Sequence, residues 1–111
     1  MSVLFDVTED NFDALIEHAQ GPVLLEVGAP RCGPCRELVR VLETLVDEVQ
    51  PHLRIATTNA DTEVGLAARL RIRSLPTLLV FRDGVEVERR CGYAGSRSVQ
   101  ALVRGLVASA G

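Results

Sequence analysis

Two cysteines three positions apart lie between an apolar segment and a long amphipathic segment, and this arrangement constrains the fold more than any other feature. Residues 32–35 read Cys-Gly-Pro-Cys. The preceding segment, 23–27, is apolar except for Glu26, which is typical of a strand covered on both faces. The following segment, 35–49, has an apolar stripe at helical spacing and ends before Pro51. The pattern predicts a strand, a turn that carries both thiols, and a helix.

A cysteine at the start of such a helix is chemically activated. Unpaired backbone amides and the positive end of the helix dipole favour the thiolate of Cys32 over its thiol. Cys35 lies one turn further along on the same side, within reach of a disulfide. Pro34 has no amide hydrogen, so it fits the first helical turn without losing a hydrogen bond. We therefore expect Cys32 to attack a disulfide of a partner and the more buried Cys35 to resolve the mixed disulfide.

The rest of the chain alternates between helix and strand patterns, without repeats or linkers. Alternating units that end in a hairpin indicate an α/β fold, a mixed sheet with helices on both faces. A length of 111 residues fits one domain, residues 1–111, since domains average roughly 150 residues. The expected elements besides the central pair are a strand at 3–7, a helix capped by Thr8 with Phe12, Leu15, Ile16 and Ala19 inward, a strand at 53–58, a short helix at 62–70, a hairpin of strands 77–82 and 85–91 around Asp83-Gly84, and a final helix capped by Ser96.

Composition excludes several classes of function. The net charge is −3, the pI is about 5.3 and only 4% of residues are aromatic, so nucleic acid is not expected as a partner. The longest apolar runs, 23–25 and 78–81, are far shorter than the ~20 residues that span a bilayer. The first ten residues show no basic region followed by an apolar run, so we expect a cytoplasmic protein without membrane contact.

A zinc site is one alternative for the cysteine pair. A structural zinc ion needs four ligands, and the only other candidates are Cys91, His18 and His52. Both histidines are expected away from the motif, so no metal is predicted. A purely structural disulfide is the other alternative, although a cytosolic chain seldom keeps one.

Three stretches together carry a family resemblance. Residues 23–36, VLLEVGAPRCGPCR, residues 73–84, RSLPTLLVFRDG, and Cys-Gly at 91–92 closely resemble the thioredoxin family. The resemblance spans the whole chain and implies the thioredoxin fold and a protein disulfide oxidoreductase without a bound cofactor. Its disulfide Cys32–Cys35 would reduce protein disulfides and be recycled by a thioredoxin-reductase-like, NADPH-dependent enzyme, the protein itself being a monomer. The motif implies a reductant, with a potential of about −270 mV.

The resemblance also implies which residues support the site and bind substrate. Pro76 would be a cis-proline against the disulfide, since cis bonds are nearly confined to proline; an ordinary trans-proline at the start of a strand is the alternative. The Leu75 backbone would then pair with an extended substrate peptide. The small size of Gly92 would let that peptide approach the rim formed by Gly33 and Pro34.

Two positions depart from the tryptophans of the family. Arg31 stands where a tryptophan usually precedes the first cysteine, and Gly28 stands where a second tryptophan is common. We expect Arg31 either to favour the Cys32 thiolate and make the disulfide more oxidising, or to extend into solvent and be screened. The loss of an apolar rim keeps two other functions open: a partner-binding module, and a more oxidising thiol catalyst with a narrow substrate.

Glu26 replaces the buried aspartate of the family, and Thr57 replaces its partner lysine. The resemblance implies that Glu26 assists proton transfer at Cys35, with a pKa raised towards neutrality by desolvation. A solvated or structurally paired glutamate is the alternative. Arg40 stands where the family often has a proline, which predicts a straighter helix.

Cys91 is the third thiol. It precedes Gly92, so it is expected near the rim of the site. It is either a small buried apolar residue at the end of a strand or an accessory regulatory thiol that forms an adduct or an intermolecular disulfide.

Overall fold

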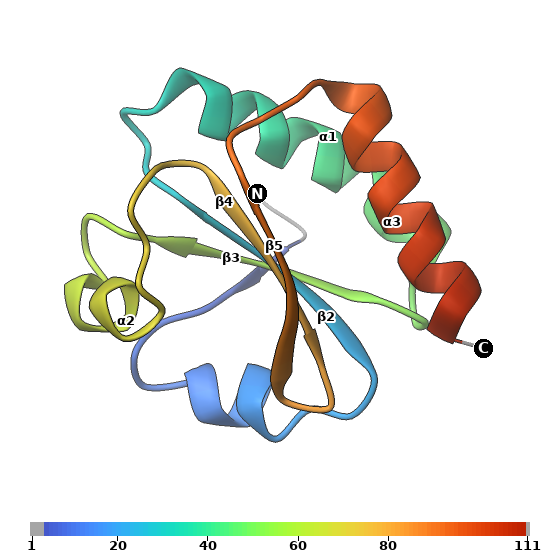
Figure 1. Cartoon of the computed structure of the whole chain (residues 1–111), viewed down its shortest axis with the longest axis horizontal. Coiled ribbons are helices and arrows are strands. Elements are labelled where there is room, and N and C mark those ends of the chain that lie inside the picture. The colour runs from blue at the N-terminus through green and yellow to red at the C-terminus, as the bar shows by residue number, and fades with distance from the viewer. Residues whose placement is uncertain (1–3, 111) are drawn as a thin grey trace.

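The computed structural model describes residues 4–110, whose strands form one five-stranded sheet in the order β1-β3-β2-β4-β5 (Figure 1). Strands β1, β3 and β2 are parallel, whereas β4 is antiparallel to both β2 and β5. The predicted mixed sheet is confirmed. The elements are β1 (Phe5–Asp6), η1 (Asp13–Glu17), β2 (Pro22–Gly28), α1 (Gly33–Val49), β3 (Arg54–Asn59), α2 (Val64–Arg69), β4 (Thr77–Arg82), β5 (Val85–Cys91) and α3 (Ser96–Ala110).

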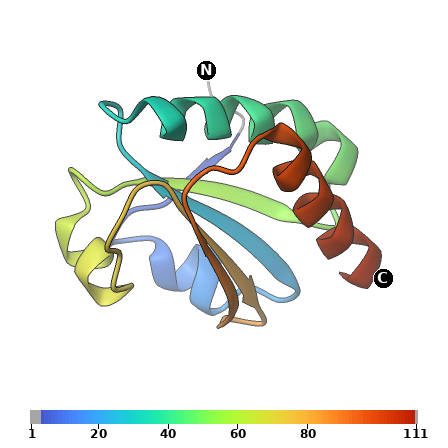
Figure 2. The same ribbon diagram turned by 45° about the horizontal axis from the view of Figure 1, so that its top comes forward.

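Helices cover both faces of the sheet, as the sequence pattern predicts. Helices α1 and α3 lie together on one face, and η1 and α2 lie on the other (Figures 1 and 2). The first face buries a cluster that includes Leu38, Leu42 and Val103. The second face buries a cluster that includes Phe12 and Ile16. Among the described residues, no helix is both long and apolar enough to cross a bilayer.

The alternation of side chains along β2 decides where its single charged residue points. Val23, Leu25 and Val27 face the cluster under η1 and α2. Leu24 faces the opposite cluster, under α1 and α3. Because side chains two residues apart share one face of a strand, Glu26 faces α1 as Leu24 does.

The first helix differs from the prediction. It is a π-helix of five residues, Asp13–Glu17, and its N-cap is Phe12 without a side-chain cap bond, so the assignment of Thr8 as the N-cap is wrong. The side chain of Asn11 accepts the amide hydrogen bond of Thr8 at 2.7 Å, and the Thr8 carbonyl accepts from Phe12 at 3.1 Å. The chain therefore makes a turn here before the helix begins. The predicted inward stripe is confirmed, because Phe12 and Ile16 are buried and Leu15 and Ala19 pack against the same cluster.

Other boundaries shift by a few residues. The predicted strand at 3–7 is described only as Phe5–Asp6, and Val3 lies outside the described residues. Helix α2 begins at Val64 rather than at 62, because the amides of residues 62 and 63 bond to the Asn59 carbonyl in a turn. Ser96 is the first residue of α3 rather than the residue before it. Helix α1 runs uninterrupted through Arg40, and whether it is straighter than in the family stays a prediction.

The predicted hairpin between β4 and β5 is confirmed. Asp83 and Gly84 both have positive φ angles, 52° and 83°, as a type I′ turn requires. A Cβ atom at position 84 would also collide with the carbonyl oxygen of Glu17, so only glycine fits there. The Asp83 carboxylate accepts a 2.7 Å hydrogen bond from the amide of Gly21, which joins the turn to the loop before β2.

Candidate active site

Cys32 and Cys35 form a disulfide at the start of α1, with their Cα atoms 5.2 Å apart. Cys32 is the N-cap of the helix, and its Sγ accepts a hydrogen bond from the Cys35 amide at 3.3 Å. Pro34 lies in the first turn, as expected. Cys35 is only 2% exposed, whereas Cys32 is half-buried. The more accessible sulfur is therefore also the one that the helix N-terminus stabilises as an anion.

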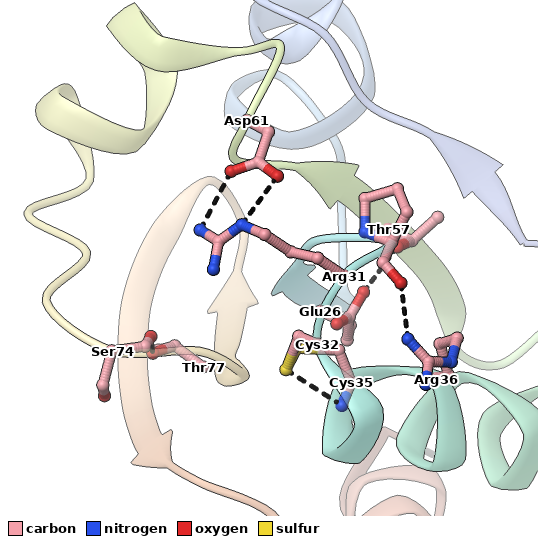
Figure 3. Close-up of a disulfide and its surroundings, with 10 residues drawn as sticks. Glu26, Arg31, Cys32, Cys35, Arg36, Thr57, Asp61, Ser74 and Thr77 are labelled. Carbon is pink, nitrogen blue, oxygen red and sulfur yellow. Dashed lines mark hydrogen bonds and ion pairs between the residues drawn. A yellow bond between two sulfur atoms is a disulfide. The ribbon is translucent and has the colours of Figure 1, made fainter.

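The loop before β4 lies beside this disulfide (Figure 3). The Leu75–Pro76 peptide bond is cis. Thr77 pairs with Val27 near the end of β2, directly before the loop that carries Cys32. The Pro76 carbonyl accepts a 2.8 Å hydrogen bond from the amide of Gly92, so the fold brings these two positions together.

Glu26 is buried beneath the disulfide. It is 1% exposed and pairs in register with Thr57 on β3. The Thr57 hydroxyl donates a 2.5 Å hydrogen bond to Oε1 of Glu26 (Figure 3). Among the described residues, Oε2 of Glu26 is the only buried side-chain oxygen or nitrogen without a hydrogen-bond partner. The alternative of a solvated glutamate is therefore wrong, whereas the bond to Thr57 agrees with the alternative of a structurally paired one.

Burial changes the acidity of this carboxyl group. Desolvation penalises the ionised form and raises the pKa of Glu26 to about 7, although the Thr57 hydrogen bond opposes the shift. A carboxyl group with a pKa near neutrality can both accept and return a proton. Because it lies beside Cys35, this carboxyl group is suited to exchange a proton with the Cys35 sulfur.

Arg31 extends into solvent, as one of the two expectations has it, and it is also paired with Asp61, which neither expectation includes. Its Nε and Nη2 donate to the two carboxylate oxygens of Asp61 at 3.0 and 3.1 Å (Figure 3). Both side chains are exposed, 70% for Arg31 and 41% for Asp61. The carboxylate offsets much of the positive charge that was expected to act on Cys32.

Glu26 and Cys35 pack into the position that a side chain of residue 28 would need. A Cβ atom at position 28 would overlap Oε2 of Glu26 and approach Cβ and Sγ of Cys35 to 3.0 and 3.1 Å. Gly28, Glu26 and Cys35 are also among the residues that line a pocket of about 370 Å³ between α1 and the ends of β2 and β3.

A side chain at position 28 should destabilise the protein. We expect Gly28→Ala to lower the free energy of unfolding by about 1–3 kcal/mol, because the new methyl group must displace buried atoms that have little room to move. Gly105→Ala on α3 is the matched control, since nothing lies within 4 Å of its added Cβ; it should raise that free energy by about 0.5–1 kcal/mol. Urea unfolding of both variants measures the two effects, and equal effects would refute the steric explanation.

Cys91 is a free, exposed thiol at the end of β5. The alternative of a buried strand residue is therefore wrong. Cys91 pairs in register with Thr77 and precedes Gly92, so it lies near the loop of Pro76. Within the described part of the chain, no group of three or more His, Cys, Asp or Glu residues is arranged to hold a metal ion.

The sequence did not identify two contributors to this site. Asp61 follows β3, thirty residues from Arg31, and no sequence pattern linked the two. Thr57 stands in place of the family's lysine, and the sequence does not indicate that its hydroxyl donates a hydrogen bond to Glu26. The alternation of side chains along β2 and β3 could have identified Thr57, because Glu26 and Thr57 both face α1 from neighbouring strands.

Comparison with known proteins agrees with this site. The thioredoxin family model matches residues 3–108. The thioredoxin of Chlamydia pneumoniae is 42% identical over 87% of this chain and 92% of its own length, and that of Bacillus subtilis (strain 168) is 38% identical over 86% and 90%. "Thioredoxin M5, chloroplastic" of Oryza sativa subsp. japonica is 32% identical over 91% of this chain, which spans only 59% of the rice protein. The chain belongs to the thioredoxin family and carries that family's disulfide oxidoreductase site at Cys32 and Cys35.

Proposed function

We propose that this chain is a general reductant of protein disulfides, with Cys32 as the attacking sulfur and Cys35 as the resolving one. The Cys32 thiolate forms a mixed disulfide with the substrate and releases one substrate thiol. The Cys35 sulfur then attacks Cys32, which releases the second substrate thiol and forms the Cys32–Cys35 disulfide. The observation that carries this division of roles is that Cys32 caps α1 while Cys35 is buried.

Proton transfer at Cys35 is the proposed role of Glu26. Cys35 must lose a proton when it resolves the mixed disulfide and regain one when the pair is reduced. Glu26 supports this role by its burial beside Cys35, its unpartnered Oε2 and its pKa of about 7.

The substrate peptide is proposed to bind in an extended conformation along Leu75. The register of β4 supports this, because Thr77 pairs with Val27 and so places the preceding loop at the end of β2 that leads to Cys32. Gly92 supports it further: its φ of 87° favours glycine, and nothing lies within 4 Å of the side chain it lacks. Gly33 and Pro34 form the opposite rim, and Arg31 with Asp61 adds a polar edge to it.

We propose one domain over residues 1–111 that acts as a monomer in the cytoplasm, without nucleic acid or membrane partners. A thioredoxin-reductase-like enzyme that uses NADPH is proposed to recycle the disulfide. Cys91 is proposed as an accessory thiol, supported by its exposure close to the substrate loop.

Equilibration in glutathione redox buffers tests the direction of the reaction. Because Asp61 offsets the charge of Arg31, we expect a reducing potential near that of thioredoxin, about −270 mV. In the same samples, NADPH with a thioredoxin reductase should drive continuous insulin reduction. A potential above about −200 mV, in the range of oxidising members of the fold, would favour the oxidising thiol catalyst instead.

A further inference from the structure

The loop of residues 70–76, between α2 and β4, carries the backbone along which the substrate peptide is proposed to bind. In the part of the chain that the structure describes, neither the amide nor the carbonyl of Leu75 has a hydrogen-bond partner. The Ser74 carbonyl beside it is occupied, because it accepts a 2.8 Å bond from the Thr77 hydroxyl. Leu75 therefore keeps its backbone groups available for an incoming extended strand.

The start of this loop has a backbone conformation that few side chains adopt. Arg71 has a φ of 56°, in the left-handed region. A residue other than glycine stays in this region only where its surroundings hold it there. On one side, the Arg71 amide donates to the Ala68 carbonyl of α2 at 3.1 Å. The other side, its carbonyl, is held by a residue far away in the sequence.

That residue is Arg89 on β5. Its Nη1 donates to the Arg71 carbonyl at 3.1 Å, and its Nη2 donates to the Leu70 carbonyl at 2.7 Å. Arg89 pairs in register with Leu79, which belongs to the cluster under η1 and α2, so the arginine lies on the face of the sheet that α2 covers. A side chain of the outer strand thus bonds two consecutive carbonyls at the point where α2 ends and the loop begins.

Glu86 fixes the direction of this guanidinium. Its Oε2 and Oε1 accept hydrogen bonds from Nε and Nη2 of Arg89 at 2.9 and 2.8 Å. The arginine is 30% exposed and the glutamate 35%, which makes this the least exposed ion pair among the described residues. A planar guanidinium can bond a carboxylate and two carbonyls at once, whereas the compact ammonium of lysine does not span them.

We propose that Arg89, oriented by Glu86, is a positioning residue for the substrate peptide. It holds the first two residues of the loop, and the loop in turn presents the backbone of Leu75 at a fixed place beside the disulfide. The inference rests on the extended binding mode of the proposed function and names the residue that keeps the binding loop ordered. Without the arginine, the loop must become ordered when the peptide binds, so binding weakens while the chemistry at Cys32 is unchanged.

The next arginine of β5 provides a matched control. Arg90 pairs in register with Leu78, which belongs to the cluster under α1 and α3, so it lies on the opposite face of the sheet. It forms an ion pair with Glu88 at 2.7 Å and, within the described chain, no hydrogen bond to the loop. Arg89→Gln and Arg90→Gln therefore remove the same charge at adjacent positions, but only the first removes bonds to the loop.

Single-turnover reduction separates peptide binding from sulfur chemistry. All proteins carry Cys91→Ser, so that only the two cysteines of the disulfide react. Each pre-reduced protein is mixed with excess insulin at several concentrations, quenched with acid and alkylated, and the loss of its free thiols is followed by mass spectrometry. The dependence of the rate on insulin concentration gives a half-saturating concentration and a maximal rate. Bis(2-hydroxyethyl) disulfide, which has no peptide backbone, is the second substrate.

Arg89→Gln should raise the half-saturating concentration of insulin on the order of tenfold and leave the maximal rate within about twofold of the parent. The rate with bis(2-hydroxyethyl) disulfide should not change, because this molecule needs only the Cys32 sulfur. Arg90→Gln should match the parent with both substrates. Equal half-saturating concentrations in the two variants, or an equal loss of rate with both substrates in Arg89→Gln, would overturn the proposal. A parent that does not reduce insulin would overturn the proposed function instead.

Arg89→Lys separates the shape of the side chain from its charge. It keeps the positive charge but not the planar group that reaches both carbonyls, so it should resemble Arg89→Gln. Binding of insulin as tight as in the parent would contradict the proposal, because the charge alone would then be sufficient.

Hydrogen exchange gives an answer that needs no substrate. The amides of Leu70, Arg71 and Ile72 donate to carbonyls of α2, and in Arg89→Gln they should exchange on the order of fivefold faster than in the parent. In Arg90→Gln they should exchange at the parent rate, and the amides of α1 should be protected alike in all proteins. Faster exchange throughout Arg89→Gln would overturn the proposal, because the arginine would then support the whole fold rather than this loop.

Discussion

Cys32→Ser is expected to abolish insulin reduction in the presence of dithiothreitol, with a fall in rate on the order of a thousandfold or more. A serine hydroxyl is not ionised at neutral pH, so it cannot replace the thiolate as nucleophile. The fold should persist, because a serine at the N-cap of α1 accepts an amide hydrogen bond as the Cys32 sulfur does. Turbidity of precipitating insulin measures the rate, and circular dichroism checks the fold.

Cys35→Ser is the matched control for the division of roles. It keeps the attacking sulfur but removes the resolving one, so a mixed disulfide between Cys32 and the substrate should accumulate. Non-reducing gels followed by mass spectrometry would detect it. An active Cys32→Ser protein, or a trapped complex in Cys32→Ser and none in Cys35→Ser, would reverse the assignment.

Glu26→Gln is expected to stabilise the oxidised protein at high pH and to change its pH dependence. The pKa of Glu26 is about 7 in the folded protein and 4.5 in its ordinary environment, so between these values only the unfolded chain is ionised. Unfolding then releases a proton, and stability falls as the pH rises through that window. Above pH 7 the penalty is complete, at about 3 kcal/mol. Glutamine has no such penalty.

Urea unfolding of both oxidised proteins at pH 4.5 and pH 8 measures this difference. All other groups titrate alike in the parent and in the variant. The difference between the free energies of unfolding of the two proteins therefore reports Glu26 alone. We expect the gap to change by about 3 kcal/mol in favour of the glutamine variant as the pH rises. A gap that does not vary with pH would show that Glu26 is not held in a desolvated site.

The position of the redox pair could be predicted because it depends on short-range rules. An apolar strand, a Cys-Gly-Pro-Cys turn and a helical stripe follow one another within thirty residues, so local pattern decides where Cys32 lies relative to α1. Glu26 was recognisable as the one charged residue of a buried strand. The hairpin turn was recognisable because Asp83-Gly84 suits positive φ angles.

What could not be predicted depends on contacts between distant segments or on space. The pairing of Arg31 with Asp61 is set by the loop after β3, which sequence order does not bring near the cysteines. The close approach of Glu26 and Cys35 to Gly28 arises only once β2 and α1 are packed together. The turn before η1 could not be predicted because the Asn11 side chain bonds the Thr8 amide. Such a bond from a side chain to the backbone competes with helix formation, and the spacing of apolar residues does not indicate it.

The two outer strands of the sheet differ from the buried strands between them. β1 is described as only two residues long, and β5 carries the ion pairs Glu86–Arg89 and Glu88–Arg90 beside its exposed Val85 and Val87. Short borders and charged side chains both hinder backbone pairing with a foreign chain. Both edges of the sheet are thus protected against the addition of strands from other molecules, which the exposed valines of β5 would otherwise favour.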